Sequence, residues 1–240
     1  ESLIFYASEL CPKRFDLSIE RFRRCIGCPP FKEIDNIQIV SLNGSCQKLF
    51  QTIGLDKGFF TGVKLALLSV SPMLLYSLIW GTWDDSISLM KLFNIVVIGA
   101  FFEELFFRGF LLGQLFRYAK WGFILAGLIV AVIFGCGHLY EGTDIVSSIM
   151  AGLVTGLGSL LFGWIFIECK YNLWCSIFLH MFMNFAWSSF AIADNGAVGD
   201  ITTNVFRILT VVMAIMWIVI YKRKNNIPYY ITKVTLWTNK

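Results

Sequence analysis

The chain has 240 residues, of which 57% are hydrophobic and only 15% are charged. Soluble domains usually carry about a quarter charged residues, so this composition excludes that class and indicates a membrane protein. The formal net charge of +4 is modest and the basic residues form no patch interleaved with aromatic residues, so we expect no nucleic-acid partner.

Residues 1–57 mix polar and apolar side chains, and we interpret them as a polar or interfacial segment. The stretch "FDLSIERFRRCI" suits either a short helix along the lipid headgroups or a plain surface loop. This segment holds four cysteines, Cys11, Cys25, Cys28 and Cys46. A single Cys-x-x-Cys pair is a weak signal for zinc or redox chemistry, so ordinary thiols are the favoured interpretation.

The apolar runs after Lys57 predict six membrane spans, because a bilayer core of about 30 Å takes about 20 apolar residues per helix. The expected spans are residues 58–80, 89–117, 121–140, 144–167, 172–192 and 203–221. The fold class is therefore an all-α, polytopic membrane helical bundle over residues 58–221, followed by a basic tail at residues 222–240. Within the fourth span, Gly152 and Gly156 are four residues apart, which favours close approach of a neighbouring helix.

The loops between the predicted spans sort by charge. One set carries Asp84, Asp85, Glu141, Asp144, Asp194 and Asp200, and the other carries Lys57, Arg117, Lys120, Lys170 and the run Lys222 to Lys224. The positive-inside rule places the second set in the cytoplasm. We therefore expect a multi-pass protein of the cell membrane with both termini in the cytoplasm.

The second span contains three ionisable groups in the stretch "GAFFEELFFRGF", namely Glu103, Glu104 and Arg108. A charge in the bilayer core is costly unless it is paired or faces a polar cavity. Glu104 and Arg108 stand at positions i and i+4 of a helix, so they share a face and are expected to pair. Glu103 is then the carboxylate left without a partner.

The two histidines, His138 and His180, both fall inside predicted spans. With a rise of 1.5 Å per residue, Glu103 and His138 stand at similar heights, ~22 and ~25 Å above the turn that joins their spans. His180 and Asn184 share a face of the fifth span at ~12 and ~18 Å, which places them one to two turns lower.

A carboxylate, two imidazoles and a carboxamide on apolar helices suit the activation of water. Glu103 and His138 are expected to deprotonate a water molecule, while His180 and Asn184 stabilise the oxyanion that forms when the water attacks a carbonyl. Glu103, His138 and His180 also form a possible zinc ligand set. The sequence lacks His-Glu-x-x-His, so a mechanism without a cofactor is favoured and zinc is the alternative.

The motifs "EELFFR", "FGCGH" and "HMFMN" resemble, in order and spacing, the EExxxR, FxxxH and HxxxN motifs of the CAAX protease and bacteriocin-processing family, over about residues 55–190. The resemblance implies an α-helical intramembrane endopeptidase of the glutamic type. It implies that Glu103 and His138 activate water, that His180 and Asn184 form the oxyanion hole, and that Glu104 and Arg108 support the site.

The resemblance also implies what kind of substrate the protein acts on. The substrate would be a membrane-associated peptide or protein from which a leader or tail is cut within the lipid bilayer. Residues 1–57 are too polar to supply the two further helices of prenyl-protein proteases, which favours a short bacterial-type member. The alternative function is a non-catalytic membrane scaffold or bacteriocin-immunity factor, and the oligomeric state stays open.

Overall fold

The computed structural model describes residues 46–190 and 198–239. The expectations for Cys11, Cys25 and Cys28 lie outside these residues, as do the possible interfacial helix near the N-terminus and the side chain of Cys46. Within the two described ranges, all regular elements are helical and no strand occurs. The predicted all-α fold is therefore confirmed.

Four of the six predicted spans are long and apolar enough to cross a membrane. They are α3 (Phe59–Trp80), α7 (Ile145–Glu168), α9 (Ile201–Lys224) and the segment Phe123–Glu141, which begins with α6 (Phe123–Cys136). Many of their large apolar side chains are exposed, as expected for surfaces that face lipid rather than water.

The other two predicted spans are helical but differ in form. The helix α8 (Leu173–Ser188) has 16 residues, or about 24 Å at 1.5 Å per residue, which is shorter than a typical bilayer core. Residues 89–118 consist of α4 (Leu89–Phe93), η2 (Asn94–Gly99), α5 (Ala100–Glu104) and η3 (Leu105–Tyr118), with η2 and η3 in π-helical geometry. Membrane crossing by these two segments stays a prediction.

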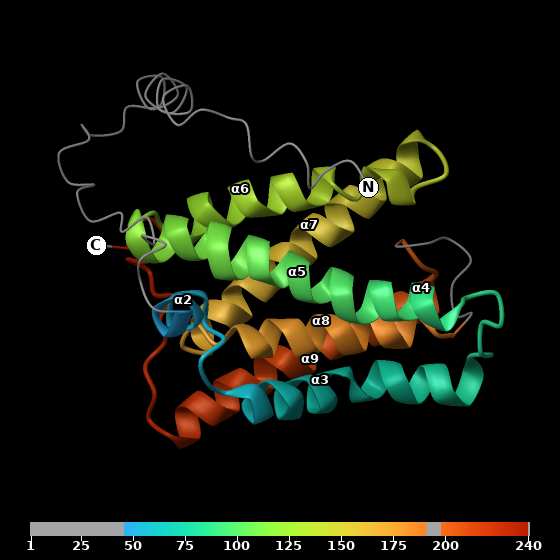
Figure 1. Ribbon diagram of the computed structural model, residues 1–240, viewed down its shortest axis with the longest axis horizontal. Helices are drawn as coiled ribbons and strands as arrows, with labels where there is room; N and C mark the ends of the chain where they lie inside the picture. The colour runs from blue at the N-terminus through green and yellow to red at the C-terminus, as the bar shows by residue number, and fades with distance from the viewer. Residues whose placement is uncertain (1–45, 191–197, 240) are drawn as a thin grey trace. The chain divides into compact units, whose positions relative to one another are not determined.

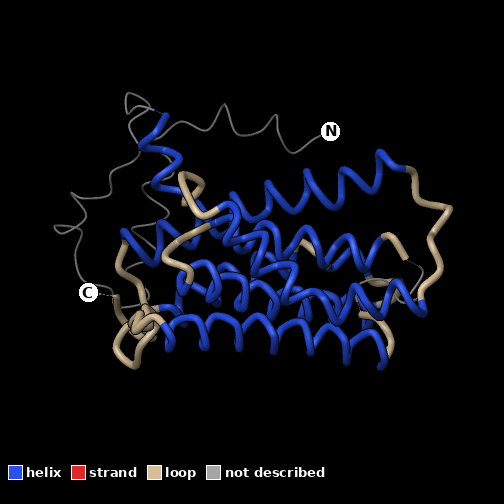
Figure 2. The backbone as a smooth tube through the Cα atoms, turned by 90° about the horizontal axis from the view of Figure 1, so that it is seen from below, coloured by secondary structure: helices blue, strands red, loops and turns tan. Residues whose placement is uncertain are grey.

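The helices pack in two groups, with α3 against α8 and α9, and α6 against α7 (Figure 1). Figure 2 shows that the described chain consists of helices joined by loops. The expected close approach at Gly152 is confirmed, because a Cβ atom on Gly135 of α6 would lie 2.4 Å from the Gly152 carbonyl oxygen. Only glycine permits this helix separation, so the glycines allow α6 and α7 to pack closely.

Local signals set where the long helices begin. The side chain of Asp144 accepts hydrogen bonds from the backbone N–H groups of Val146 (2.8 Å) and Ser147 (3.1 Å), which forms a capping box at the start of α7. The side chain of Asn172 accepts a hydrogen bond from Trp174 N (3.2 Å) and donates one to Gly58 O (3.0 Å). These bonds connect the start of α8 to the start of α3.

The segment after α9 folds back onto the bundle. The backbone N–H groups of Phe123 and Ile124 donate to Thr235 O (2.9 Å) and Leu236 O (3.1 Å), which satisfies donors that the first turn of α6 leaves unpaired. The helix α9 continues beyond the predicted boundary at residue 221 as far as Lys224, and Lys222 is buried.

Candidate active site

The expected pairing of Glu104 with Arg108 is present. Arg108 Nη1 lies 3.0 Å from Glu104 Oε1, and the side chains are 1% and 0% exposed. Glu104 ends α5 and Arg108 lies in the first turn of η3, so one continuous helical segment supplies both. The guanidinium also lies over the rings of Phe134 (4.8 Å) and Phe162 (5.4 Å), which favours a buried cation.

This ion pair does not use all its hydrogen-bonding capacity. Glu104 Oε2 accepts no hydrogen bond from a described residue, and Arg108 Nε and Nη1 donate none, so the 3.0 Å contact is electrostatic and lacks hydrogen-bond geometry. Buried polar groups normally have partners, and groups left without one often belong to functional sites.

The ring of His180 lies near both glutamates. Its Nδ1 lies 2.8 Å from Glu104 Oε1, and because a carboxylate only accepts, Nδ1 carries the proton and donates. Its Nε2 lies 3.8 Å from Glu103 Oε2, which is too far for a direct hydrogen bond. The Glu103 side chain is 36% exposed, whereas that of Glu104 is fully buried, so Glu103 is the carboxylate that a ligand can reach.

His180 meets the glutamates, so the gap of one to two turns that the α-helical rise gives below Glu103 is closed in the structure. The physical reason lies in η3, which separates Glu103 from the turn that follows Tyr118. A π-helix closes i→i+5 hydrogen bonds and holds more residues per turn than an α-helix, so it is shorter for the same number of residues. A height calculated with the α-helical rise of 1.5 Å per residue is therefore too large for Glu103.

His138 takes no part in this contact. The helix α6 ends at Cys136, and His138 precedes the short 3-10 helix η4 (Leu139–Glu141). Its Nδ1 donates to the carbonyl oxygen of Phe134 (2.7 Å), and its Nε2 lies 4.0 Å from Glu141 Oε1. No hydrogen bond or ion pair joins the described side chains of His138 and Glu103. Glu141 was expected to be a loop residue, although its i+3 spacing from His138 could have indicated the contact.

Asn184 shares α8 with His180 and lies against η2. Its Nδ2 donates to the backbone carbonyl of Ile95 at 3.3 Å, which is a long hydrogen bond. The π-helical segment η2 thus supplies the neighbour of Asn184, as η3 supplies Arg108.

The three residues of the alternative zinc site, Glu103, His138 and His180, are not grouped as metal ligands. Among residues 46–190 and 198–239, no group of three or more His, Cys, Asp or Glu side chains is arranged to hold a metal ion. Because Glu103, His138 and His180 do not form such a group, we derive no chemical step through a metal.

Comparison with protein families finds a match over part of the chain. Residues 85–186 match the family model described as "Type II CAAX prenyl endopeptidase Rce1-like". The matched range includes all the residues from Glu103 to Asn184 discussed above. Comparisons with curated proteins and with solved structures find no match. The family match confirms the resemblance to the CAAX protease and bacteriocin-processing family.

Proposed function

We propose that this chain is an intramembrane endopeptidase that hydrolyses a peptide bond of a membrane-associated peptide or protein. One observation carries the proposal: an accessible carboxylate, Glu103, lies beside His180, which a buried ion pair holds in place among apolar helices. Ionisable groups are rare in such surroundings and usually serve a function. The match to a peptidase family points to the same chemistry.

Glu103 is the proposed general base. The 3.8 Å between Glu103 Oε2 and His180 Nε2 allows one water molecule to contact both atoms. Glu103 takes a proton as the water oxygen bonds to the scissile carbonyl carbon, and the carbonyl oxygen becomes an oxyanion. Glu103 then returns the proton to the leaving amine as the carbon–nitrogen bond breaks.

The remaining residues receive the roles that their geometry suits. His138 Nδ1 donates to Phe134 O, so its Nε2 is the ring atom able to accept a proton from water. His180 and Asn184, at i and i+4 of α8, are proposed to hold the oxyanion. Because His180 Nδ1 already donates to Glu104, its Nε2 donates to the oxyanion when the ring is the doubly protonated imidazolium. Glu104 and Arg108 act indirectly, because Glu104 fixes the ring of His180.

Two observations favour a second candidate, a non-catalytic scaffold or immunity factor that binds a peptide in the same region. His138 and Glu103 are not joined, and the Asn184 amide already donates to Ile95 O. For this candidate, a chain with Glu103→Gln would keep its full function in cells.

The deciding experiment is cleavage of a peptide panel by purified wild-type protein and Glu103→Gln in detergent. The panel holds secreted-peptide precursors and C-terminal tail peptides with and without a prenyl group. Glutamine keeps the side-chain volume and removes the base, so we expect cleavage to fall by at least about 100-fold. Asp85→Asn, the same chemical change at an exposed loop residue, is the matched control and should cleave normally.

A folded Glu103→Gln protein that cleaves as fast as wild type would refute the proposal. A chelator in parallel reactions tests the cofactor, since we expect cleavage to be unchanged by it. Loss of cleavage with chelator would instead make His138 and His180 metal ligands. If neither protein cleaves the panel, complementation in cells with Glu103→Gln separates the two candidate functions.

A further inference from the structure

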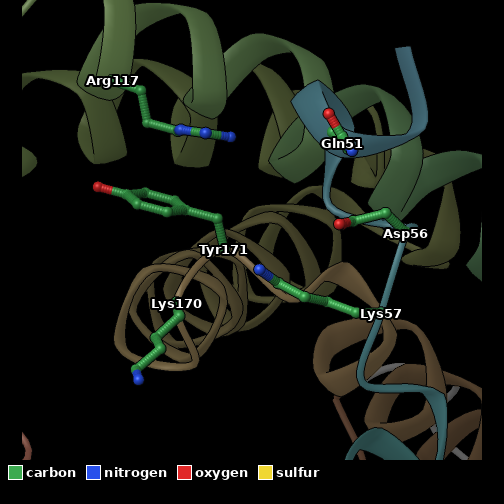
Figure 3. A pocket seen from close by; sticks show the side chains of 6 residues that line it. All are labelled: Gln51, Asp56, Lys57, Arg117, Lys170 and Tyr171. Atoms are coloured by element: carbon green, nitrogen blue, oxygen red, sulfur yellow. The ribbon is translucent and has the colours of Figure 1, made fainter. Parts of the chain in front are cut away.

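A cavity of about 300 Å³ lies at the end of the helices where α2 (Cys46–Ile53), the end of η3 and the loop between α7 and α8 meet. The residues that line it are Gln51, Asp56, Lys57, Arg117, Lys170 and Tyr171 (Figure 3). None of them belongs to the candidate active site. Three of the six are cations, so the cavity calls for a ligand that carries negative charge.

Arg117 is held in place at this cavity. Its Nη1 donates to the carbonyl oxygen of Thr52 (2.8 Å), and its guanidinium lies 4.3 Å from the centre of the Tyr171 ring. Burial raises the pKa of the Tyr171 hydroxyl above its usual value of 10.0, so this group stays neutral and does not compete as an anion. The other N–H groups of Arg117 donate to no described residue, and a guanidinium fixed in this way suits a phosphate.

The walls of the cavity are fixed by the backbone. Lys170 and Tyr171 both have left-handed conformations, with φ of 60° and 57°, which are unfavourable for residues with a side chain. Gly54 packs so closely that a Cβ atom there would lie 1.9 Å from Tyr171 O, and Gly54 O accepts a hydrogen bond from Leu173 N (2.9 Å). Strained backbone of this kind is often maintained at binding sites.

The surroundings of the cavity suit a lipid. Leu49 and Phe50 on α2, and Phe59 and Phe60 at the start of α3, are large apolar side chains that are 42%, 48%, 43% and 76% exposed. They flank the segment that carries Asp56 and Lys57, so apolar surface for acyl chains adjoins the charged groups. Basic pockets at the ends of membrane helices recognise phospholipid headgroups.

We propose that this cavity binds the headgroup of a phospholipid that carries a primary amine beside its phosphate, of which phosphatidylethanolamine is the simplest. Figure 3 shows the Arg117 guanidinium and the Lys57 ammonium directed toward a common space, into which the Asp56 carboxylate also points. The two cations complement a phosphate and the carboxylate complements an ammonium. A purely anionic headgroup would leave Asp56 facing negative charge.

The test is a lipid titration of the purified, delipidated full chain, followed by native mass spectrometry. The ligands are phosphatidylethanolamine, phosphatidylglycerol, phosphatidylcholine and inorganic phosphate. The variants are Arg117→Gln, Lys57→Gln and Asp56→Asn. The matched control is Lys233→Gln, which also removes one positive charge, at an exposed residue that does not line the cavity.

We expect wild type to bind phosphatidylethanolamine most tightly. Removal of one charge-assisted contact in Lys57→Gln or Arg117→Gln should weaken this binding by about tenfold, whereas Lys233→Gln should bind as wild type does. Asp56→Asn should lose the preference for phosphatidylethanolamine over phosphatidylglycerol. Lys57 is exposed, so Lys57→Gln decides the question even if Arg117→Gln folds poorly.

Three results would overturn the proposal. Unchanged lipid binding by Lys57→Gln would show that the lipid sits elsewhere. Displacement of lipid by inorganic phosphate at equal concentration would make this a site for a soluble anion. If Asp56→Asn still prefers phosphatidylethanolamine, the Asp56 carboxylate takes no part in recognising the headgroup.

Discussion

Glu104 and Glu168 are both buried carboxylates paired with a cation, but they differ in the hydrogen bonds that they accept. Glu168 accepts hydrogen bonds from Lys222 Nζ and from the backbone N–H groups of Tyr230 (3.2 Å) and Ile231 (2.8 Å), so both of its carboxylate oxygens have partners. Glu104 accepts from His180 through Oε1 alone, and its Oε2 has no partner among the described residues.

The two cations differ in the same way. Lys222 also donates to Pro228 O (3.0 Å) and lies 4.6 Å from the centre of the Tyr230 ring, whereas Arg108 keeps donors without acceptors. A fully satisfied buried pair mainly holds segments together. The incompletely satisfied pair stands next to the accessible carboxylate of Glu103, where a water molecule or substrate could supply the missing partners.

The largest loss of stability is expected when the ion pair of Glu168 and Lys222 is broken. Lys222→Met leaves Glu168 as a buried charge without its cation, which should lower the free energy of unfolding by about 3–5 kcal/mol. Cleavage per folded molecule should stay at the wild-type level. Thermal unfolding in detergent and a cleavage assay on the folded fraction measure the two quantities.

A double variant, Glu168→Leu with Lys222→Met, is the control for this change. Because it removes both charges, it should recover much of the lost stability. A single Lys222→Met protein with an unchanged melting temperature would contradict the structural role of the pair.

A smaller loss of stability is expected at the candidate active site. Glu104→Gln leaves Arg108 without a counter-ion, but the rings of Phe134 and Phe162 still face the guanidinium, so we expect a cost of about 2 kcal/mol. The same variant should lose cleavage activity, because His180 loses the carboxylate that orients it. Melting temperature and cleavage rate, compared with Arg108→Met, would distinguish the two effects. Wild-type values of both for Glu104→Gln would refute the pairing.

The smallest effect is expected at Asp144, an exposed carboxylate that caps α7. Hydrogen bonds from the Ser147 backbone and side chain lower the pKa of Asp144 below its usual value of 3.8. A lowered folded-state pKa means that the charge adds stability above pH 3.8, and that this stability is lost as the pH falls through the folded-state pKa.

Asp144→Asn keeps a capping side chain without the charge. Its melting temperature should lie below that of wild type at about pH 6, and the difference should shrink toward about pH 3. A difference that stays constant over this range would show that the charge makes no contribution.

Regular geometry allowed part of this structure to be predicted from the sequence. The Glu104–Arg108 pair followed from i, i+4 spacing, and the close contact at Gly152 followed from the spacing of small residues. Four spans followed from length and apolarity alone. Each of these features depends on residues close together in the chain.

Departures from regular geometry could not be predicted in this way. The contact of His180 with Glu104 depends on the π-helical form of η3, for which the sequence shows no distinct signal. The pair of Glu168 and Lys222 joins residues 54 positions apart. The sequence alone presented Lys222 as part of a basic tail, because nothing in its neighbours indicated a buried acceptor.

The return of the C-terminal segment has a consequence for how the protein is made. A ribosome delivers α6 and α7 to the membrane well before residues 222–236 leave the exit tunnel. Until then, Glu168 has no lysine beside it, and the first donors of α6 lack the acceptors that Thr235 and Leu236 provide. The final assembly of this end of the bundle must therefore wait until residues 222–236 have left the tunnel, and before that these groups need water or the insertion machinery as partners.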